Sequence, residues 1–320
     1  MKIKKRYFYV CVVLLIVLIT AASYYFYKPK KTEKKEEIWK VDENGYLSYP
    51  LNREPVKFNR QDYGISGNLT IHKIIYQSRN DNIYGLLVLP STAADLLPGI
   101  VLLPGAGVSK ESELEFAKKI AILDAAVLVI DQRGVGETNG QFPTLDEDYA
   151  SFLGGKEPVQ HLMVYDALRA YDLLKNAPFV DSDRIAIAGE SLGGRIAIIA
   201  AAIDRNVNGA LAISSSGLDF EETNDTRVNA FLKSINSDHY IGLIAPRKVV
   251  IVHNKYDNII TFDSALNSYK KAQEPKGFIL VNDTSCNHGY CDSMYNGLVD
   301  ALDYLVGIRS RTLVSISEQK

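Results

Sequence analysis

Short apolar runs alternate with longer, helically patterned stretches over most of the chain. The runs are rich in small and branched residues, which is typical of strands buried on both faces of a sheet. They are residues 99–103, 126–130, 185–188, 208–213, 248–252 and 277–281. Apolar residues at helical spacing lie between them, at 110–123, 159–176, 192–203, 264–273 and 295–306. Strands that alternate with helices predict an α/β fold with a mostly parallel central sheet and helices on both faces.

Two further regions have their own pattern. Residues 68–78 and 82–90 are rich in β-branched residues and flank a turn at 79–81, which predicts an antiparallel hairpin. Residues 219–245 fit no strand. Their scattered aromatic and aliphatic side chains predict helical pieces that form a small cap over the functional site of the protein. A plain surface insertion is the alternative for this segment.

The N-terminal stretch is unlike the rest. Residues 7–27 carry no charge, follow four basic residues and have tyrosines at both ends. This length suits a helix that crosses a bilayer, for which about 20 residues are needed. We therefore expect a membrane anchor with the rest of the protein outside the cytoplasm. The alternative is a cleaved signal peptide and a secreted protein, because the small residues at 20–22 offer a cleavage point.

The pattern divides the chain into four parts: an anchor or signal peptide at 1–27, a charged linker and N-terminal extension at 28–62, the main α/β domain at 63–308 with the possible cap at 219–245, and a tail at 309–320. Of the 320 residues, 47% are hydrophobic and 23% are charged, and the net charge is −2. Because no cluster of Lys and Arg lies beyond the N-terminal region, we expect no nucleic-acid partner.

The strand at 185–188 leads into G-E-S-L-G, in which Gly189, Ser191 and Gly193 match G-x-S-x-G. An apolar helix follows. A serine on a sharp turn between strand and helix is a candidate nucleophile, and the glycines let neighbouring backbone pass. The amides at the start of the helix point at any negative charge that develops beside the serine.

A serine hydroxyl needs a base to remove its proton, and the base needs a third group to hold it. Asp257 follows the strand at 248–252, and His288 follows the last strand. The ends of parallel strands meet at one edge of a sheet, so we expect both near Ser191. Asp263 and Asp283 are the other acids in this region. We interpret them as a helix cap and a loop-former.

The other four histidines are given other roles. We expect His72 and His161 to lie at the surface, His239 in the cap, and His253 to pack or hydrogen bond near the site.

Backbone groups complete the predicted site. The amide of Leu192 and an amide from the loop P-G-A-G, which we assign to Ala106, would stabilise an oxyanion. Cys286 and Cys291 bracket His288 and would form a disulfide if the domain lies outside the cytoplasm; two free thiols are the alternative. No spacing indicates a metal site, and this chemistry requires no cofactor.

The successive motifs L-L-P-G-A-G, D-Q-R-G-V-G-E-T-N-G, V-D-S-D-R-I-A-I-A-G-E-S-L-G-G, H-N-K-Y-D-N-I-I and C-N-H-G resemble those of the α/β-hydrolase superfamily. The pattern is most similar to the branch of dienelactone hydrolase-like and prolyl oligopeptidase-like enzymes. The order Ser191, Asp257, His288 is also that of this superfamily. Thr138 departs from the pattern, because that branch has serine there.

The resemblance implies a serine hydrolase that acts on a small-molecule acyl substrate. We expect it to cleave carboxylic esters through an acyl-enzyme on Ser191. A peptidase or amidase, an acyltransferase and a non-catalytic binding protein of the same fold are the alternatives.

Overall fold

The computed structural model describes residues 38–92 and 95–308, and before them only Tyr7, Leu14, residues 16–21, Ser23 and Tyr24. The chain divides into two units, residues 1–38 and 39–320; the described positions up to Tyr24 in the first unit are helical. Among the described residues, none of the helices has the length and apolar character that crossing a bilayer requires. The predicted anchor at 1–27 falls mostly outside the described residues, and the stretches 28–37 and 309–320 fall outside them entirely.

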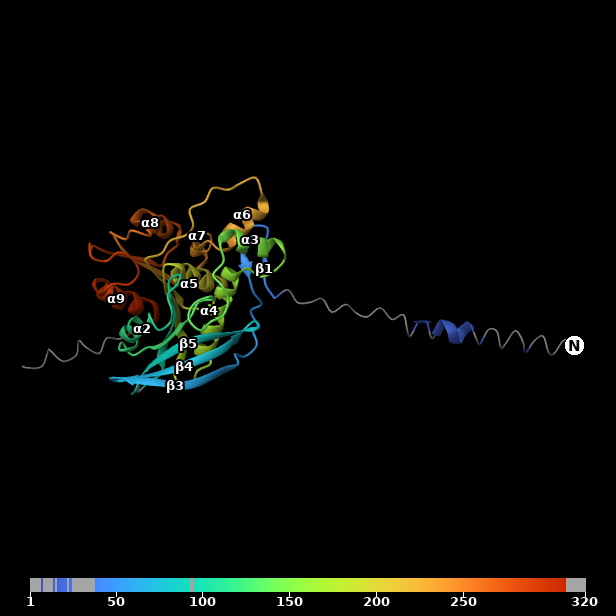
Figure 1. The fold of residues 1–320 in the computed structure, drawn as a ribbon, viewed down its shortest axis with the longest axis horizontal. Helices are drawn as coiled ribbons and strands as arrows, with labels where there is room; N and C mark the ends of the chain where they lie inside the picture. The colour runs from blue at the N-terminus through green and yellow to red at the C-terminus, as the bar shows by residue number, and fades with distance from the viewer. Residues whose placement is uncertain are drawn as a thin grey trace, which may run out of the picture. The chain divides into compact units, whose positions relative to one another are not determined.

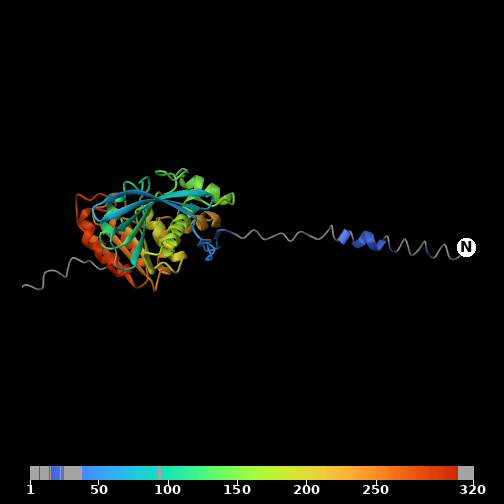
Figure 2. The ribbon, with the colours of Figure 1, turned by 90° about the horizontal axis from the view of Figure 1, so that it is seen from below.

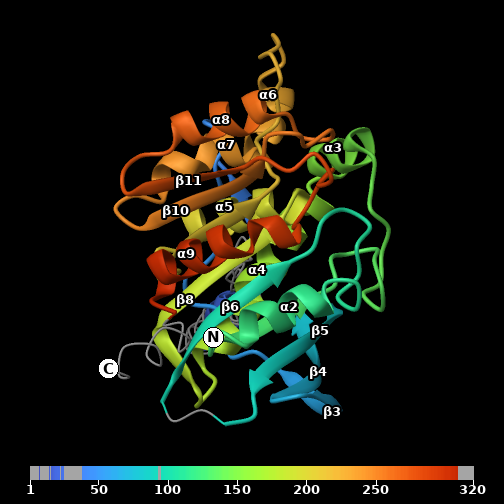
Figure 3. The same ribbon diagram turned by 90° about the vertical axis from the view of Figure 1, so that its left-hand side faces the viewer.

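A nine-stranded sheet is the centre of the described part of the second unit (Figure 3). The strand order is β11-β10-β9-β8-β6-β7-β5-β4-β3. Neighbouring strands among β6 to β11 are parallel, whereas β5 pairs antiparallel with both β7 and β4, and β4 with β3. The bounds are β3 (Phe58–Ser66), β4 (Leu69–Ser78), β5 (Asp81–Pro90), β6 (Leu97–Leu103), β7 (Ala126–Ile130), β8 (Val180–Glu190), β9 (Gly209–Ile213), β10 (Lys248–Asn254) and β11 (Lys276–Val281). A separate short pair consists of β1 (Lys40–Val41) and β2 (Leu47–Ser48).

The apolar runs of the sequence are the buried strands. All residues of β6, β7 and β9 are buried, as expected for parallel strands covered on both faces. The predicted hairpin is β4 and β5, which pair antiparallel from Ser78 and Asp81 outward.

Strand β3 corrects the predicted domain boundary at residue 63. It pairs with β4 at the edge of the sheet (Figure 2), and the second unit already begins at Trp39. Eight of its nine residues are exposed. A strand without a buried face has no alternation of apolar and polar residues, so the pattern gave no sign of it.

Helices cover both faces of the sheet. On one face lie α2 (Leu114–Ala121) and α9 (Tyr295–Val306), which stand in front of the sheet in Figure 3. On the other lie α4 (Val159–Lys175) and α5 (Leu192–Ile203). The last helix before β11 is α8 (Phe262–Lys271). This arrangement is the predicted α/β-hydrolase fold.

The segment predicted as a cap contains α6 (Thr226–Ser234), α7 (Ser237–Tyr240) and the 3₁₀ turn η1 (Ile241–Leu243). Helix α3 (Leu145–Leu153), from the stretch before α4, lies beside α6 (Figures 1 and 3). Their aromatic rings meet, with the centroids of Phe152 and Phe231 5.6 Å apart. The region predicted as a cap is therefore built together with α3, a helix from a segment that is distant in sequence.

The expectation that His161 lies at the surface is wrong. Its side chain is fully buried, and Nε2 lies 2.7 Å from the hydroxyl of Ser234 on α6. Trp39 and Phe231 also approach the imidazole ring. A position in the first turn of a helix is usually exposed, but here the N-terminal segment and α6 cover it.

Candidate active site

Ser191 lies where β8 ends and α5 begins. Its backbone is left-handed, with φ 50° and ψ −114°, which costs a residue with a side chain of the order of 1 kcal/mol or more. Backbone approaches backbone so closely here that a Cβ at Gly189 would overlap Gly193, and a Cβ at Gly193 would overlap the carbonyl of Leu103. The two glycines of the motif are therefore steric requirements of the turn.

His288 and Asp257 form a hydrogen-bonded pair. The Nδ1–H group of His288 donates to both carboxylate oxygens of Asp257, at 3.0 and 2.9 Å. One of these oxygens, Oδ1, also accepts the amides of Ile259 and Ile260, each at 2.9 Å. Burial alone would raise the pKa of Asp257, but these hydrogen bonds outweigh it and lower the pKa below its usual range. The carboxylate is thus held ionised, and it holds the imidazole by one nitrogen.

The two other acids near the base have separate partners. Asp283 Oδ1 accepts the amide and the hydroxyl of Ser285, at 2.9 and 2.6 Å. Asp263 is the second residue of α8, and the helix is capped by Thr261, so the expectation that Asp263 caps it is wrong. Within the described residues neither carboxylate hydrogen bonds to His288.

The loop that carries His288 is tied down on both sides. A disulfide joins Cys286 and Cys291 across it. The hydroxyl of Ser214, at the end of β9, donates to the carbonyl of Gly289 at 3.1 Å. The side-chain amide of Asn254 donates to the carbonyl of Cys286 at 2.5 Å. These bonds fix the position of the histidine relative to the strand ends.

Glu190 connects this loop to the nucleophile turn. Its Oε1 accepts the amide of Tyr290 at 3.1 Å, and a Cβ at Gly289 would lie 2.9 Å from its Oε2. The carboxyl group of Glu113 lies against that of Glu190. Burial, and then the neighbouring Glu113, raises the pKa of Glu190 to about 8; burial also raises the pKa of Glu113. Near neutral pH the two carboxyls therefore share a proton.

We predict that this pair makes stability depend on pH. A carboxyl with a raised pKa contributes stability that is complete below its unfolded pKa, 4.5 for Glu, and is lost as the pH rises through the folded value of about 8. Glu190→Gln keeps an oxygen for the Tyr290 amide and removes the proton equilibrium. Between about pH 6 and about pH 9, urea unfolding should show the wild type losing at least about 1.4 kcal/mol more than the variant, the equivalent of one pKa unit. Equal losses would show that the carboxyls do not interact.

The loop predicted to supply the second oxyanion donor lies beside Ser191. A Cβ at Gly105 would be 3.7 Å from the Cβ of Ser191. The amide of Ala106 donates to no other group within the described part of the chain. The amide of Leu192 belongs to the first turn of α5, where amides have no partner within the helix. Neither amide is thus committed to another group, and each can donate a hydrogen bond to a ligand oxygen.

The D-Q-R-G motif supports that loop. Asp131 accepts the backbone amide and the ammonium group of Lys110, each at 2.8 Å. The side-chain amide of Gln132 donates to the carbonyl of Pro104 at 3.0 Å. Thr138, where the resemblance leads one to expect serine, accepts the amide of Tyr84 through its hydroxyl at 3.1 Å. The position therefore needs a hydroxyl group, and threonine supplies it.

The hydroxyl of Ser191 makes no hydrogen bond to any described residue. The structure thus brings Asp257 and His288 together and ties the loop of His288 to Glu190, the neighbour of Ser191. It does not show a hydrogen bond between Ser191 and His288. In unliganded enzymes such contacts often tighten only when substrate binds.

The other sequence-predicted histidines are not hydrogen-bonded to this pair, although His253 lies near it. His253 is buried, and its Nε2–H donates to the carbonyl of Ile260 at 3.1 Å, so it supports the loop after Asp257. His239 stacks on Tyr46, with the ring centroids 3.9 Å apart. Within the described ranges, no group of three or more His, Cys, Asp or Glu side chains is arranged to hold a metal ion.

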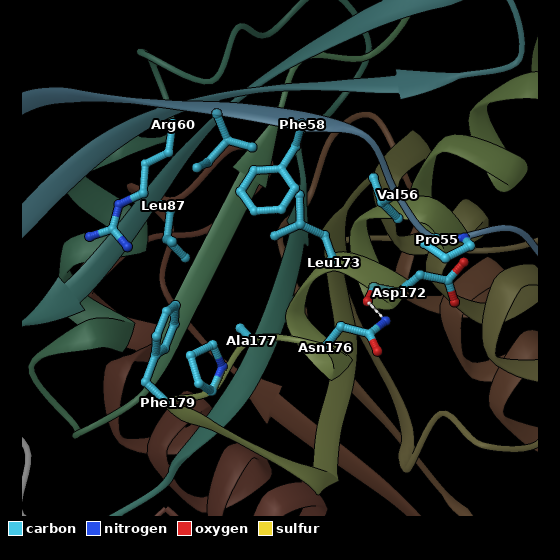
Figure 4. A pocket seen from close by; sticks show the side chains of 12 residues that line it. Pro55, Val56, Phe58, Arg60, Leu87, Asp172, Leu173, Asn176, Ala177 and Phe179 are labelled. Atoms are coloured by element: carbon cyan, nitrogen blue, oxygen red, sulfur yellow. Dashed lines mark hydrogen bonds between the residues drawn. The ribbon is translucent and has the colours of Figure 1, made fainter.

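A pocket of about 330 Å³ lies between β3 to β5 and the C-terminal end of α4 (Figure 4). Its wall is mostly apolar, with Phe58, Leu87, Leu173 and Phe179 facing the cavity. None of Ser191, Asp257 and His288 lines it. We therefore do not assign it to the acyl group.

Sequence reasoning missed three charged residues around the nucleophile. Glu190 was considered only as a weak candidate to anchor the amine of a peptide substrate, and Glu113 lies on a distant segment whose helical pattern gave no sign of the pairing. Arg195, one helical turn beyond Ser191, is considered below. Nothing in the local pattern distinguishes a buried charge from an exposed one.

Comparison with protein families finds a match to the family described as acetyl xylan esterase (AXE1), over residues 20–235. The matched region contains Ser191 and ends before Asp257 and His288. Among curated proteins, the chain is 24% identical over 190 residues to the uncharacterised protein YfhR of *Escherichia coli* K12, covering 55% of this chain and 61% of that one. It is 30% identical over 118 residues to the polyketide transferase grgF of a *Penicillium* species, covering 37% and 36%. The matches thus span about three fifths or less of these relatives.

Solved structures show the same fold. The acetyl xylan esterase from *Paenibacillus* sp. R4 superimposes with a TM-score of 0.63 and 21% identity, covering 79% of this chain and 90% of that one. The glucuronoyl esterase from *Solibacter usitatus* gives 0.55 and 14%, covering 79% and 87%. At these identities the likeness is one of fold.

Proposed function

The chain belongs to the acetyl xylan esterase (AXE1) family, and we propose that its ester hydrolysis runs through an acyl-enzyme formed on Ser191. The observation that carries this proposal is the pairing of His288 Nδ1 with both oxygens of Asp257, on a loop tied to the residue next to Ser191. In this scheme Ser191 Oγ attacks the ester carbonyl carbon while His288 Nε2 takes its proton. Asp257 stabilises the imidazolium that forms.

The remaining steps use the groups around the turn. The amides of Leu192 and Ala106 stabilise the oxyanion of the tetrahedral intermediate. His288 gives its proton to the departing alkoxide, which leaves the acyl group on Ser191. Water, activated by the same imidazole, then releases the acid. The family name favours short acyl groups, and acetate esters are the first substrates to test.

The test is a series of p-nitrophenyl esters of increasing acyl length, hydrolysed by the full-length chain in detergent. We expect turnover to be fastest with acetate and to fall as the acyl chain grows. Absence of turnover on every ester, with labelling by a fluorophosphonate retained, would move the assignment to amides or peptides. Absence of both would contradict the proposed role of Ser191.

An acyltransferase is the second candidate, because the relatives include two proteins named polyketide transferase. The two activities share every step up to the acyl-enzyme and differ in what attacks it. Added alcohol should divert product from the free acid to a new ester if transfer is favoured. Release of free acid alone, at rising alcohol concentration, assigns the protein as a hydrolase.

We further propose that residues 1–27 anchor the protein with its catalytic domain outside the cytoplasm. The uncharged stretch 7–27 supports this, and the disulfide Cys286–Cys291 suits an oxidising compartment. After cell fractionation we expect the full chain in the membrane fraction, and a chain starting at Lys28 in the soluble fraction. Recovery of a shortened chain in the medium would identify a cleaved signal peptide instead.

A further inference from the structure

Arg195 occupies the first turn of the helix that Ser191 begins. Its backbone amide donates to the carbonyl of Ser191 at 3.2 Å, which makes the two residues helical neighbours four positions apart. Side chains with this spacing lie on the same face, and long helical side chains lean toward the N-terminus. From this spacing we expect the Arg195 side chain to lean back toward the turn that carries Ser191.

The guanidinium group of Arg195 makes no hydrogen bond and no ion pair within the described part of the chain. The residue is half-buried, and its nitrogens remain accessible to solvent. Burial lowers its pKa to about 10, and no acidic side chain offsets that effect. The carboxyl groups of Glu113 and Glu190 do not compensate the charge of Arg195, because they contact each other and the Tyr290 amide.

The other buried arginines are compensated. Arg53 pairs with Asp172 and Asp204, and Arg133 with Asp166. Arg247 donates to three backbone carbonyls. A cation that the fold itself does not satisfy, one turn from a nucleophile, is placed for a ligand.

We propose that Arg195 binds a carboxylate carried by the ester substrate. This rests on the proposed esterase function and narrows its substrate class to esters with an anionic group near the scissile bond. A guanidinium group matches a carboxylate through two parallel hydrogen bonds. Four residues of helix rise by roughly 6 Å, which the length of the arginine side chain spans. The carboxylate therefore lies a few bonds from the scissile carbonyl, on either the acyl or the alcohol part.

The experiment compares matched ester pairs that differ in charge. On the acyl side, the p-nitrophenyl half-ester of glutarate is compared with that of its neutral amide, glutaramate. On the alcohol side, 4-acetoxybenzoate is compared with 4-acetoxybenzamide. We expect the wild type to favour the carboxylate member of one pair by roughly tenfold or more in kcat/KM, about the value of one charged hydrogen-bonded contact. The pair that shows the preference identifies the part of the substrate that carries the charge.

Arg195→Met keeps the length of the side chain and removes the charge, and Arg195→Lys keeps the charge without the two-pronged geometry. The ratio of kcat/KM between charged and neutral esters should fall to about one in the first variant and to an intermediate value in the second. Arg205→Met, at an exposed site beyond the C-terminal end of the same helix, is the matched control and should keep the wild-type ratio. An unchanged ratio in Arg195→Met, or no charge preference in the wild type, overturns the proposal.

Two further measurements distinguish a failure of this proposal from a failure of the esterase function and from an effect of Arg195 on folding. If no ester is turned over, the esterase function has failed, and binding is measured directly as the thermal stabilisation of each protein by glutarate. We expect stabilisation of the wild type and none of Arg195→Met; equal shifts overturn the proposal. Because the guanidinium group makes no hydrogen bond or ion pair within the described residues, Arg195→Met should melt no lower than the wild type. A lower Tm would assign the residue a structural role instead.

Discussion

Ser191→Ala is expected to lower kcat for p-nitrophenyl acetate by roughly 10⁴- to 10⁶-fold, the loss that removal of a catalytic serine causes in serine hydrolases. The acyl-enzyme cannot form without Oγ, and the remaining oxyanion donors give only weak catalysis by bound water. Folding should be preserved, because the Ser191 hydroxyl makes no hydrogen bond within the described chain. The left-handed backbone at this position is retained by alanine at a cost similar to that for serine.

The measurement pairs turnover with labelling by a fluorophosphonate, which Ser191→Ala should abolish. Ser216→Ala is the control, since that hydroxyl donates only to the adjacent carbonyl of Gly217. It should change kcat by no more than a few fold. If Ser191→Ala kept activity within tenfold of the wild type, or were still labelled, another residue would be the nucleophile.

The sequence predicted those elements whose pattern reflects burial on a sheet. The strands β6, β7 and β9 were found because covering helices make them apolar throughout. Edge strand β3 was missed because solvent on its faces leaves no such constraint on its residues. Helix α3 was also missed, although Thr144 and Glu147 form a capping box that could have identified its start.

The features of the candidate site also fall into those that the sequence pattern predicted and those that it did not. The pairing of Asp257 with His288 was predictable because parallel strands bring their ends to one edge, so position along the chain implies proximity. The pairing of Glu190 with Glu113 depends on where the N-terminal end of α2 lies relative to the end of β8, which no local pattern specifies. For Arg195 the informative feature is the absence of a partner. That absence becomes visible only when every neighbouring acid has been placed.

Asp257→Asn is expected to lower kcat by roughly 10⁴-fold with little change in the fold, because it alters which nitrogen of His288 carries the proton. The asparagine oxygen can still accept the amides of Ile259 and Ile260, which now bond to Oδ1. Its NH₂ group then faces Nδ1 of His288. Nδ1 becomes a hydrogen-bond acceptor, the proton moves to Nε2, and the imidazole can no longer take the proton of Ser191.

The two other acids of this region provide the controls. Asp283→Asn keeps an oxygen for Ser285, and Asp263→Asn alters an exposed first-turn residue of α8, so both should keep kcat within a few fold of the wild type. The comparison is made by turnover of the same acetate ester, with circular dichroism to confirm folding. A loss in Asp283→Asn as large as that in Asp257→Asn would mean that the loop of His288 moves during the reaction and exchanges one acid for the other. A small loss in Asp257→Asn alone would mean that His288 acts without a carboxylate partner, and the hydrogen-bonded pair would then be structural.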